Sequence, residues 1–204
     1  MAVTSRRQVL LAASATVVLA GCDRLGFGPP RPRFRSIDIT GVGYARDFRL
    51  KDPSGQERTL ADFKGKVVAV FFGFTQCPDV CPTSLTELTQ VKQALGPDGD
   101  RLQGVFITVD PERDTPPILK EYMAHFDPSF VALRGTPEET AAVAKEFKVY
   151  YAKVPGKTPD TYTMDHTAGV YLFDPAGQVR LFARHGQGAD ALVHDIRELL
   201  RTAG

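Results

Sequence analysis

The sequence of 204 residues lacks tryptophan altogether and contains only three methionines and three cysteines. With aromatic residues at 9%, it has little material for an aromatic stacking surface. Its formal net charge of +1 is spread along the chain, without the basic bias that nucleic-acid-binding proteins normally show. It has neither low-complexity nor collagen-like composition, which argues against disorder and a fibrous fold. A chain of this length with 43% hydrophobic residues is long enough for one domain with its own core.

The first 22 residues have the composition of a bacterial export signal. Arg6 and Arg7 precede an apolar run at 9–20, and Gly21-Cys22 follows it. As a helix this run would extend about 18 Å, short of a hydrocarbon core of about 30 Å. A basic start, a short apolar stretch and small residues before a boundary are typical of a signal peptide. Residues 19–22 (LAGC) are similar to a lipobox, which predicts a lipoprotein signal peptide at 1–21 and lipidation of Cys22.

An uncleaved N-terminal anchor is the alternative, and residues 5–7 (SRR) are also similar to a twin-arginine export signal. Either way we expect an exported protein at the bacterial cell membrane, with its domain on the extracytoplasmic side. Without residues 1–21 the charge balance is 23 basic against 24 acidic residues, so binding driven by charge alone is excluded. Residues 22–36 are rich in proline and arginine and predict an extended tether, either resting on anionic headgroups or solvated.

Residues 37–204 are predicted to form one α/β domain. Continuous apolar runs are typical of strands buried on both faces, and amphipathic segments of helices. The expected strands lie at 66–74, 102–109 and 129–133, and the expected helices at 82–95, 117–126, from 136 onward and at 189–201. An apolar segment at 149–154 is followed by a predicted polar loop at 155–167, and then by a hairpin at 168–183.

This order of elements is typical of a thioredoxin-like sandwich, in which helices flank a central mixed sheet. Residues near 40–60 are expected to add an N-terminal β-hairpin beside the core. No sustained heptad or large apolar repeat indicates an obligate assembly, so we expect a monomer.

Two cysteines lie between a predicted buried strand and a helix, in residues 77–82 (CPDVCP). Because proline disfavours the helical conformation for the residue before it, Cys81 is predicted to be the N-cap or one residue upstream. Both sulfurs would then lie near unpaired N–H groups and the positive end of the helix dipole, which favours the thiolate. The C-x-x-x-C spacing is one residue longer than the redox C-x-x-C, and it allows either a disulfide or a shared metal ion.

A structural disulfide is the alternative for this pair, since such bridges are common in exported domains. However, a bridge that encloses three residues would remove little chain entropy. The end of a central strand is also where α/β proteins place their active sites. Both considerations favour a functional role for Cys77 and Cys81.

A third metal ligand is predicted at His166. It directly precedes the strand that should pair with 67–74, and it is therefore expected to face the cysteine turn. A structural role in its loop is the alternative. His125, His185 and His194 are less favoured as the third metal ligand. Two thiolates and an imidazole form a soft trigonal set suited to Cu(I), with room for a fourth donor for Cu(II). Structural zinc would normally show four protein ligands.

Acidic residues near these ligands have open roles. Asp79 is a candidate fourth donor or a turn residue, and Asp165 is a candidate to orient His166 through a hydrogen bond. Asp110, Glu112 and Asp114 alternate after a strand. A hard-metal site is conceivable there, but capping of the next helix by Thr115 or Asp114 is the better interpretation.

Three segments resemble, in order, the three signatures of the Sco/SenC family: 77–82 (CPDVCP), 109–116 (VDPERDTP) and 165–167 (DHT). The resemblance covers about 37–204, although the family more often has serine at the position of Thr167. It implies a membrane-anchored, thioredoxin-like copper chaperone with Cys77, Cys81 and His166 as copper ligands. The implied partner is the copper-accepting subunit of cytochrome c oxidase, whose dinuclear copper centre such proteins help to assemble, or another copper chaperone.

Two hypotheses follow. The first is a metallochaperone that passes copper to a partner by ligand exchange, which makes a turnover enzyme the less favoured interpretation. The second is a thiol–disulfide oxidoreductase that keeps a partner's cysteines reduced, in which Cys77 or Cys81 forms a mixed disulfide. A thiol peroxidase is a weaker third possibility. His166 discriminates between the first two, because disulfide exchange does not require it.

Overall fold

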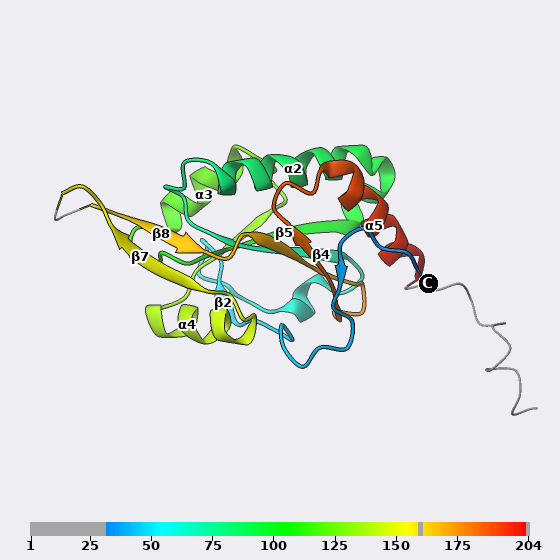
Figure 1. The fold of residues 1–204 in the computed structure, drawn as a ribbon, viewed down its shortest axis with the longest axis horizontal. Coiled ribbons are helices and arrows are strands. Elements are labelled where there is room, and N and C mark those ends of the chain that lie inside the picture. Colours follow the sequence, from blue (N-terminus) through cyan, green and yellow to red (C-terminus); the bar gives the residue numbers. More distant parts are fainter. Residues whose placement is uncertain (1–31, 159–160, 203–204) are drawn as a thin grey trace, which may run out of the picture. The chain divides into compact units, whose positions relative to one another are not determined.

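A six-stranded mixed sheet organises the computed structural model, which describes residues 32–158 and 161–202 (Figure 1). The strands, in order across the sheet, are β1 (Ile37–Asp38), β10 (Val179–Arg184), β9 (Gly169–Phe173), β4 (Val67–Gly73), β5 (Leu102–Thr108) and β6 (Val131–Leu133). β4, β5 and β6 run parallel, whereas β9 is antiparallel to both β4 and β10. The predicted α/β class with a central mixed sheet is confirmed.

The two central strands explain why helices cover both faces of the sheet. Every residue of β4 and of β5 is buried, so neither strand has a side that water could contact. Helices α2 (Val80–Ala94) and α3 (Pro116–Ala124) lie on one side of the sheet, and α4 (Pro137–Glu146) lies on the other (Figure 1). The last helix, α5 (Ala189–Thr202), packs against α2. Two short 3₁₀ helices, Leu60–Phe63 and Gly96–Arg101, precede β4 and β5.

The start of the domain is tied to α5 by a buried carboxylate. Asp195 is fully buried, and its two oxygens accept hydrogen bonds from the backbone N–H groups of Arg35 and Ser36, each at 2.8 Å. Immediately afterwards, β1 pairs with β10 at the edge of the sheet, with Ile37 opposite Phe182. The first described residues are therefore fixed to the last helix and, as the edge strand β1, to β10.

The predicted N-terminal hairpin is present as β2 (Leu50–Lys51) and β3 (Glu57–Arg58). Lys51 and Arg134 exchange backbone hydrogen bonds of 3.0 and 2.8 Å, which attach this hairpin beyond the end of β6. The segment at 155–167 differs from its prediction as a polar loop. It contributes to a second hairpin, β7 (Tyr151–Pro155) and β8 (Tyr162–His166), which projects from the body (Figure 1).

Helix α2 begins earlier than predicted, at Val80, with Asp79 as its N-cap. Cys81 is therefore the second helical residue, and the prediction that it lies at or before the N-cap is wrong. Pro82 is compatible with this start because its missing N–H falls in the first turn, where the donors have no partner within the helix. Cys81 therefore adopts the helical conformation, although a residue before proline usually avoids it.

Part of the predicted organisation lies outside the described residues. The predicted signal peptide at 1–21, the lipidation site Cys22 and most of the predicted tether at 22–36 belong to this part. Among the described residues, the structure contains no helix with the length and apolar character needed to cross a bilayer.

Candidate metal centre

The structure brings two sulfurs and one imidazole together at the end of β4. Possible ligand atoms of Cys77, Cys81 and His166 all lie within 4.8 Å of one another. Cys81 Sγ is 3.6 Å from His166 Nε2, and the backbone N–H of Cys81 donates to Cys77 Sγ at 3.4 Å. Both cysteines are free thiols. In the part of the chain that the structure describes, these residues form the one group of three or more histidine, cysteine and acidic side chains with this geometry.

The cysteines owe their positions to the turn between β4 and α2. The backbone N–H of Cys77 donates to the carbonyl of Phe74 at 3.2 Å, which closes the turn after β4. Cys81 is fully buried, whereas Cys77 is half-buried. A Cβ atom at Gly73 would lie 2.8 Å from Cys81 Sγ and 2.8 Å from the ring of Phe106. Only glycine lets the Cys81 sulfur approach the backbone of β4 so closely.

His166 is the last residue of β8, and its ring is held on both sides. Its Nδ1 lies 3.1 Å from the carbonyl oxygen of Thr167, which can only accept, so Nδ1 carries the proton and Nε2 is free to bind a metal. The ring meets Phe71 and Phe74 edge to face, with centroid separations of 6.2 and 5.9 Å. The backbone of Thr167 is in turn hydrogen bonded to Tyr150, whose carbonyl accepts from it at 2.9 Å.

The acidic candidates lie outside this group. Asp165 is exposed, and the Nδ1 atom that it was expected to hold donates instead to Thr167. The alternation of a strand explains this, because His166 faces the cysteines and its neighbour therefore faces away. Asp79 is exposed as the N-cap of α2, and its carboxylate accepts from the Thr83 hydroxyl at 3.3 Å. The structure thus places Asp79 as a turn residue.

Burial determines the protonation states of the ligands. It raises the pKa of the Cys81 thiol well above its ordinary value, and the hydrogen bond with Cys77 adds to this. Burial also lowers the pKa of His166, which keeps the imidazole neutral. The expectation that Cys81 is a thiolate is wrong for the metal-free chain, because burial raises the pKa of this thiol. Cys81 is a thiol that donates its proton toward Nε2, and a metal ion would displace that proton.

A buried carboxylate, that of Asp114, stabilises the cysteine turn through hydrogen bonds. Asp114 is fully buried, and it accepts hydrogen bonds from the Thr75 hydroxyl at 2.6 Å and from the hydroxyl of Thr108. The backbone N–H of Thr75 also donates to it at 3.1 Å. Burial raises the pKa of this carboxyl. Asp114 therefore fixes the turn and does not cap α3, whose N-cap is Thr115 without a side-chain hydrogen bond.

The remaining acids of this loop are also engaged, which argues against a hard-metal site. Asp110 pairs with Arg113, and Glu112 pairs with Lys153 at 2.7 Å. Three residues beside the centre were not predicted from the sequence: Arg113, and Gln76 and Tyr162, to which it donates hydrogen bonds. The sequence signal that could have identified Arg113 is that it is the one basic residue in 110–114, beside three acidic residues.

The other three histidines lie elsewhere and contact protein groups. His125 Nδ1 is 2.8 Å from the Glu121 carbonyl, and His194 Nε2 is 2.9 Å from that of Arg33. His185 Nδ1 is 3.1 Å from the hydroxyl of Ser84. None of them belongs to the metal-ligating group among the described residues.

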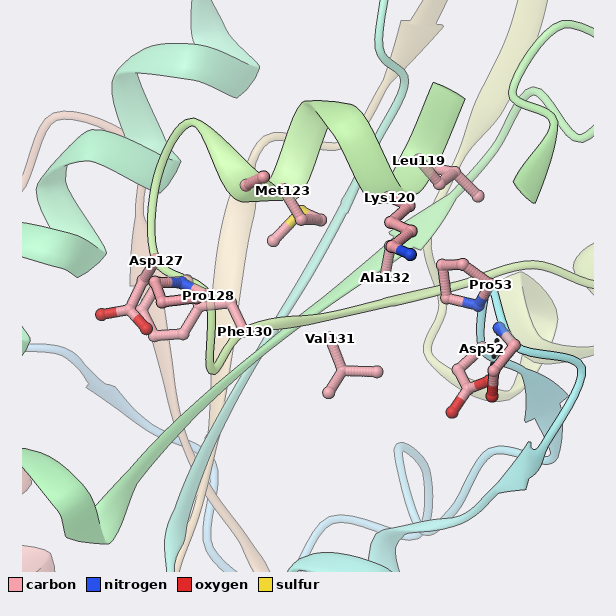
Figure 2. A pocket seen from close by; sticks show the side chains of 12 residues that line it. Asp52, Pro53, Leu119, Lys120, Met123, Asp127, Pro128, Phe130, Val131 and Ala132 are labelled. Carbon is pink, nitrogen blue, oxygen red and sulfur yellow. Dashed lines mark hydrogen bonds between the residues drawn. The ribbon is translucent and has the colours of Figure 1, made fainter. Parts of the chain in front are cut away.

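A groove of about 420 Å³ lies between α3 and β6, with Asp52 and Asp127 at its two ends (Figure 2). Its lining is largely apolar, and it contains none of the three candidate ligands. Its two carboxylates are already paired, Asp127 with Lys92 and Asp52 with Arg58. The groove is therefore not part of the candidate metal centre.

Comparison with known proteins gives a family and several solved relatives. Residues 40–201 match the sequence profile of a family described as SCO1/SenC. A "SCO2-like protein" of Rickettsia felis is 40% identical over 153 residues, covering 74% of this chain and 75% of its own length. "Protein SCO2 homolog, mitochondrial" of Mus musculus is 40% identical over 167 residues, covering 81% of this chain and 65% of its own length.

Solved structures show the same fold. ScoI of Bradyrhizobium japonicum, determined with copper bound, is 44% identical and superposes with a TM-score of 0.67, covering 74% of this chain and 96% of its own. Apo Sco1 of Thermus thermophilus is 36% identical with a TM-score of 0.72, covering 83% of this chain and 98% of its own. The thioredoxin-like prediction is consistent with these relatives.

Proposed function

The chain belongs to the SCO1/SenC family, and from this membership we propose that it is a copper-binding metallochaperone whose ligands are Cys77, Cys81 and His166. The observation that carries the proposal is the donor set itself, two thiols and a neutral imidazole within 4.8 Å of one another. Thiolate and imidazole donors in a trigonal arrangement suit Cu(I). The copper-bound ScoI of Bradyrhizobium japonicum, at 44% identity, supports the same cargo.

Each ligand has a distinct part in holding the ion. Cys81, fully buried, gives up its proton and fixes the ion against β4. His166 presents Nε2 without any change of protonation, since its pKa is lowered and its proton is on Nδ1. Cys77 is half-buried, as is His166, so an approaching protein can reach its sulfur, whereas that of Cys81 is fully buried. Transfer would proceed by ligand exchange, in which a partner's donor atom replaces Cys77 first.

We further propose that the copper passes to the copper-accepting subunit of cytochrome c oxidase or to another copper chaperone. The resemblance of the three sequence signatures to the Sco/SenC family supports this partner. We also propose that the protein is exported and attached to the membrane through a lipid on Cys22. The apolar run at 9–20 and the lipobox-like sequence at 19–22 support this location.

The test is an anaerobic Cu(I) titration of the reduced protein, comparing wild type with Cys77→Ala, Cys81→Ala and His166→Ala. We expect one copper per wild-type chain, lost in all three variants at a competitor concentration that the wild type withstands. His125→Ala is the matched control and should bind like wild type, because His125 contacts only a carbonyl on its own helix. Undiminished affinity in His166→Ala would exclude the three-ligand centre.

A second candidate function is thiol–disulfide exchange. It is favoured by the close approach of the two free thiols and by the accessibility of Cys77. Cys77 would attack a partner disulfide, forming a mixed disulfide and releasing one partner thiol. Cys81 would then attack the Cys77 sulfur, which leaves a Cys77–Cys81 disulfide and a partner dithiol. Exchange with a disulfide peptide should then survive in His166→Ala. Failure of the wild type to exchange at all would leave copper binding as the single function of the pair.

A further inference from the structure

The three candidate ligands come from two elements that share no strand pairing. Cys77 and Cys81 belong to the turn after β4 and to α2, whereas His166 ends β8. β7 and β8 pair only with each other and form a separate two-stranded sheet among the described strands. The main chain connects the end of β8 to β9, which pairs with β4, and side-chain contacts complete the attachment of the hairpin to the cysteine turn.

The guanidinium of Arg113 makes several of these contacts. Arg113 Nη1 donates to the side-chain oxygen of Gln76, directly before Cys77, at 3.0 Å, and to the backbone carbonyl of Tyr162 in β8 at 2.8 Å. Its Nε donates to Asp110. The guanidinium carbon lies 3.6 Å from the ring centroid of Tyr162, and the Tyr162 hydroxyl donates to Asp110 at 2.9 Å. Arg113 thus joins the cysteine turn, the loop after β5 and the histidine strand.

This arrangement is not what stability alone would select. Asp110 is almost fully buried, and buried ion pairs are often no more stable than apolar replacements. Arg113 Nη2 is also buried without a hydrogen-bond partner among the described residues. A buried donor without a hydrogen-bond partner is destabilising. The ion pair of Lys153 with Glu112 also crosses this boundary, but it joins exposed side chains and contributes little.

We propose that Arg113 is a positioning residue that holds β8 against the cysteine turn, and that it thereby determines whether copper meets three protein ligands or two. The proposal rests on the proposed function for its consequence in copper binding. The placement of the His166 ring is a property of the metal-free chain and can be measured without copper.

The chain offers a closely matched control in Arg180. Its side chain is 19% exposed, against 21% for Arg113, and it pairs with the shielded carboxylate of Asp174 at 3.0 Å. It also lies over an aromatic ring, that of Phe34, at 5.9 Å. Arg180 is at the start of β10, at the opposite end of the sheet from the metal centre. Arg180→Gln therefore removes a comparable interaction without touching the site.

The first experiment measures the reduced, metal-free protein by NMR. The nuclear Overhauser contacts between the rings of His166 and Phe74, which meet at 5.9 Å, should be lost in Arg113→Gln and kept in Arg180→Gln. If Arg113→Gln does not fold, Arg113→Lys takes its place, since it keeps the charge beside Asp110 but cannot donate to two acceptors in parallel. Intact ring contacts in the folded variant would overturn the proposal, whatever the outcome with copper.

The second experiment measures Cu(I) affinity by competition and the ligands of bound Cu(I) by X-ray absorption. Arg113→Gln should lose affinity by about 10–100-fold, together with the nitrogen ligand, whereas Arg180→Gln should match wild type. Arg113→Gln combined with His166→Ala should bind no more weakly than His166→Ala alone, because both changes remove the same ligand. Additive losses would overturn the proposal. A wild type that binds no copper would refute the proposed function and leave the NMR result to decide the positioning role.

Discussion

Gly73 shows at the residue scale how closely the candidate ligands are packed. It is the last residue of β4, and the sulfur of Cys81 occupies the space in which a side chain would begin. Cys81 can be fully buried against the central strand because this position has no Cβ atom. The identity of one residue in a strand therefore decides where a ligand on the following helix can lie.

Gly73→Ala should destabilise the protein. The added Cβ would lie 2.8 to 2.9 Å from Cys81 Sγ and the rings of Phe106 and Phe71, so at least one of them must shift. Overpacking of this kind typically costs about 1–3 kcal/mol, to be measured as a loss in the free energy of urea unfolding. Gly43→Ala is the control, since a Cβ there meets nothing within 4 Å. Equal stability of the two variants would show that the site accommodates the methyl group.

Tyr122→Phe should leave the protein as stable as wild type or make it more stable. The Tyr122 hydroxyl is buried without a hydrogen-bond partner, and its ring packs on Phe106 and Phe126 with centroids at 5.7 and 5.1 Å. Removing the hydroxyl relieves a desolvation penalty of about 1–3 kcal/mol and keeps the ring contacts. Tyr171→Phe should do the opposite, because it breaks a buried hydrogen bond of 2.6 Å to the Phe147 carbonyl. Urea unfolding of both variants distinguishes the two cases, and a loss in Tyr122→Phe equal to that in Tyr171→Phe would contradict the prediction.

At the scale of elements, the loop between β5 and α3 supports the centre through buried carboxylates. Asp114 holds Thr75 in the cysteine turn, and Asp110 holds Arg113. The contact of Asp114 joins segments 39 residues apart, and Arg113 in turn donates to the Tyr162 carbonyl, 49 residues away, so the loop connects the cysteine turn with the histidine hairpin. The integrity of the loop should therefore depend on the protonation state of Asp114.

Asp114 should make stability fall as pH rises through its folded pKa. Because burial raises the pKa of this carboxyl, the folded state keeps a proton that the unfolded chain, with a pKa of about 3.9, has already released. Its contribution to stability is fully present below the unfolded pKa and is lost as pH increases past the folded value. Asp114→Asn should remove this dependence from a series of unfolding free energies measured across acid pH. An unchanged pH profile in Asp114→Asn would show that Asp114 is not the responsible group.

Elements with strong apolar patterns were predictable from the sequence. The strands β4 and β5 were expected to within two residues, since every side chain in them is buried and the pattern is continuous. The hairpin β7–β8 was missed because half of the residues in its strands are exposed, and Met164 is the one buried residue among them. A strand without an apolar face leaves no periodic signal.

Within the site, the proximity of Cys77, Cys81 and His166 was predicted because topology brings the end of one strand opposite the entrance to the next. The protonation state of Cys81 was not predicted. It depends on how deeply the thiol is buried against Gly73 and Phe106, and not on its position at a helix start. The bridge through Arg113 was also missed. Its acceptors, Gln76 and Tyr162, are 37 and 49 residues away in the chain.

At the scale of the whole molecule, the ligands join elements that are distant in sequence, so metal binding should stabilise the fold. Copper that binds the native state alone stabilises it by about 2.7 kcal/mol at about 100 times its dissociation constant. We expect thermal unfolding of the reduced protein to shift upward with buffered Cu(I). Cys81→Ala should show no such shift, and neither should Cys77→Ala. A shift of equal size in all three proteins would indicate binding elsewhere.

The attachment of the domain's first residues to Asp195 and β10 has a mechanical consequence. A pulling force applied through the chain before Arg33 first meets the contact between the Arg33 carbonyl and His194, then the two hydrogen bonds to the Asp195 carboxylate, and then the pairing of the edge strand β1 with β10. None of these contacts includes a residue of the cysteine turn or of the histidine hairpin. The force therefore enters the domain through α5 and the edge strand β1, and none of the three ligand residues takes part in the contacts that receive it.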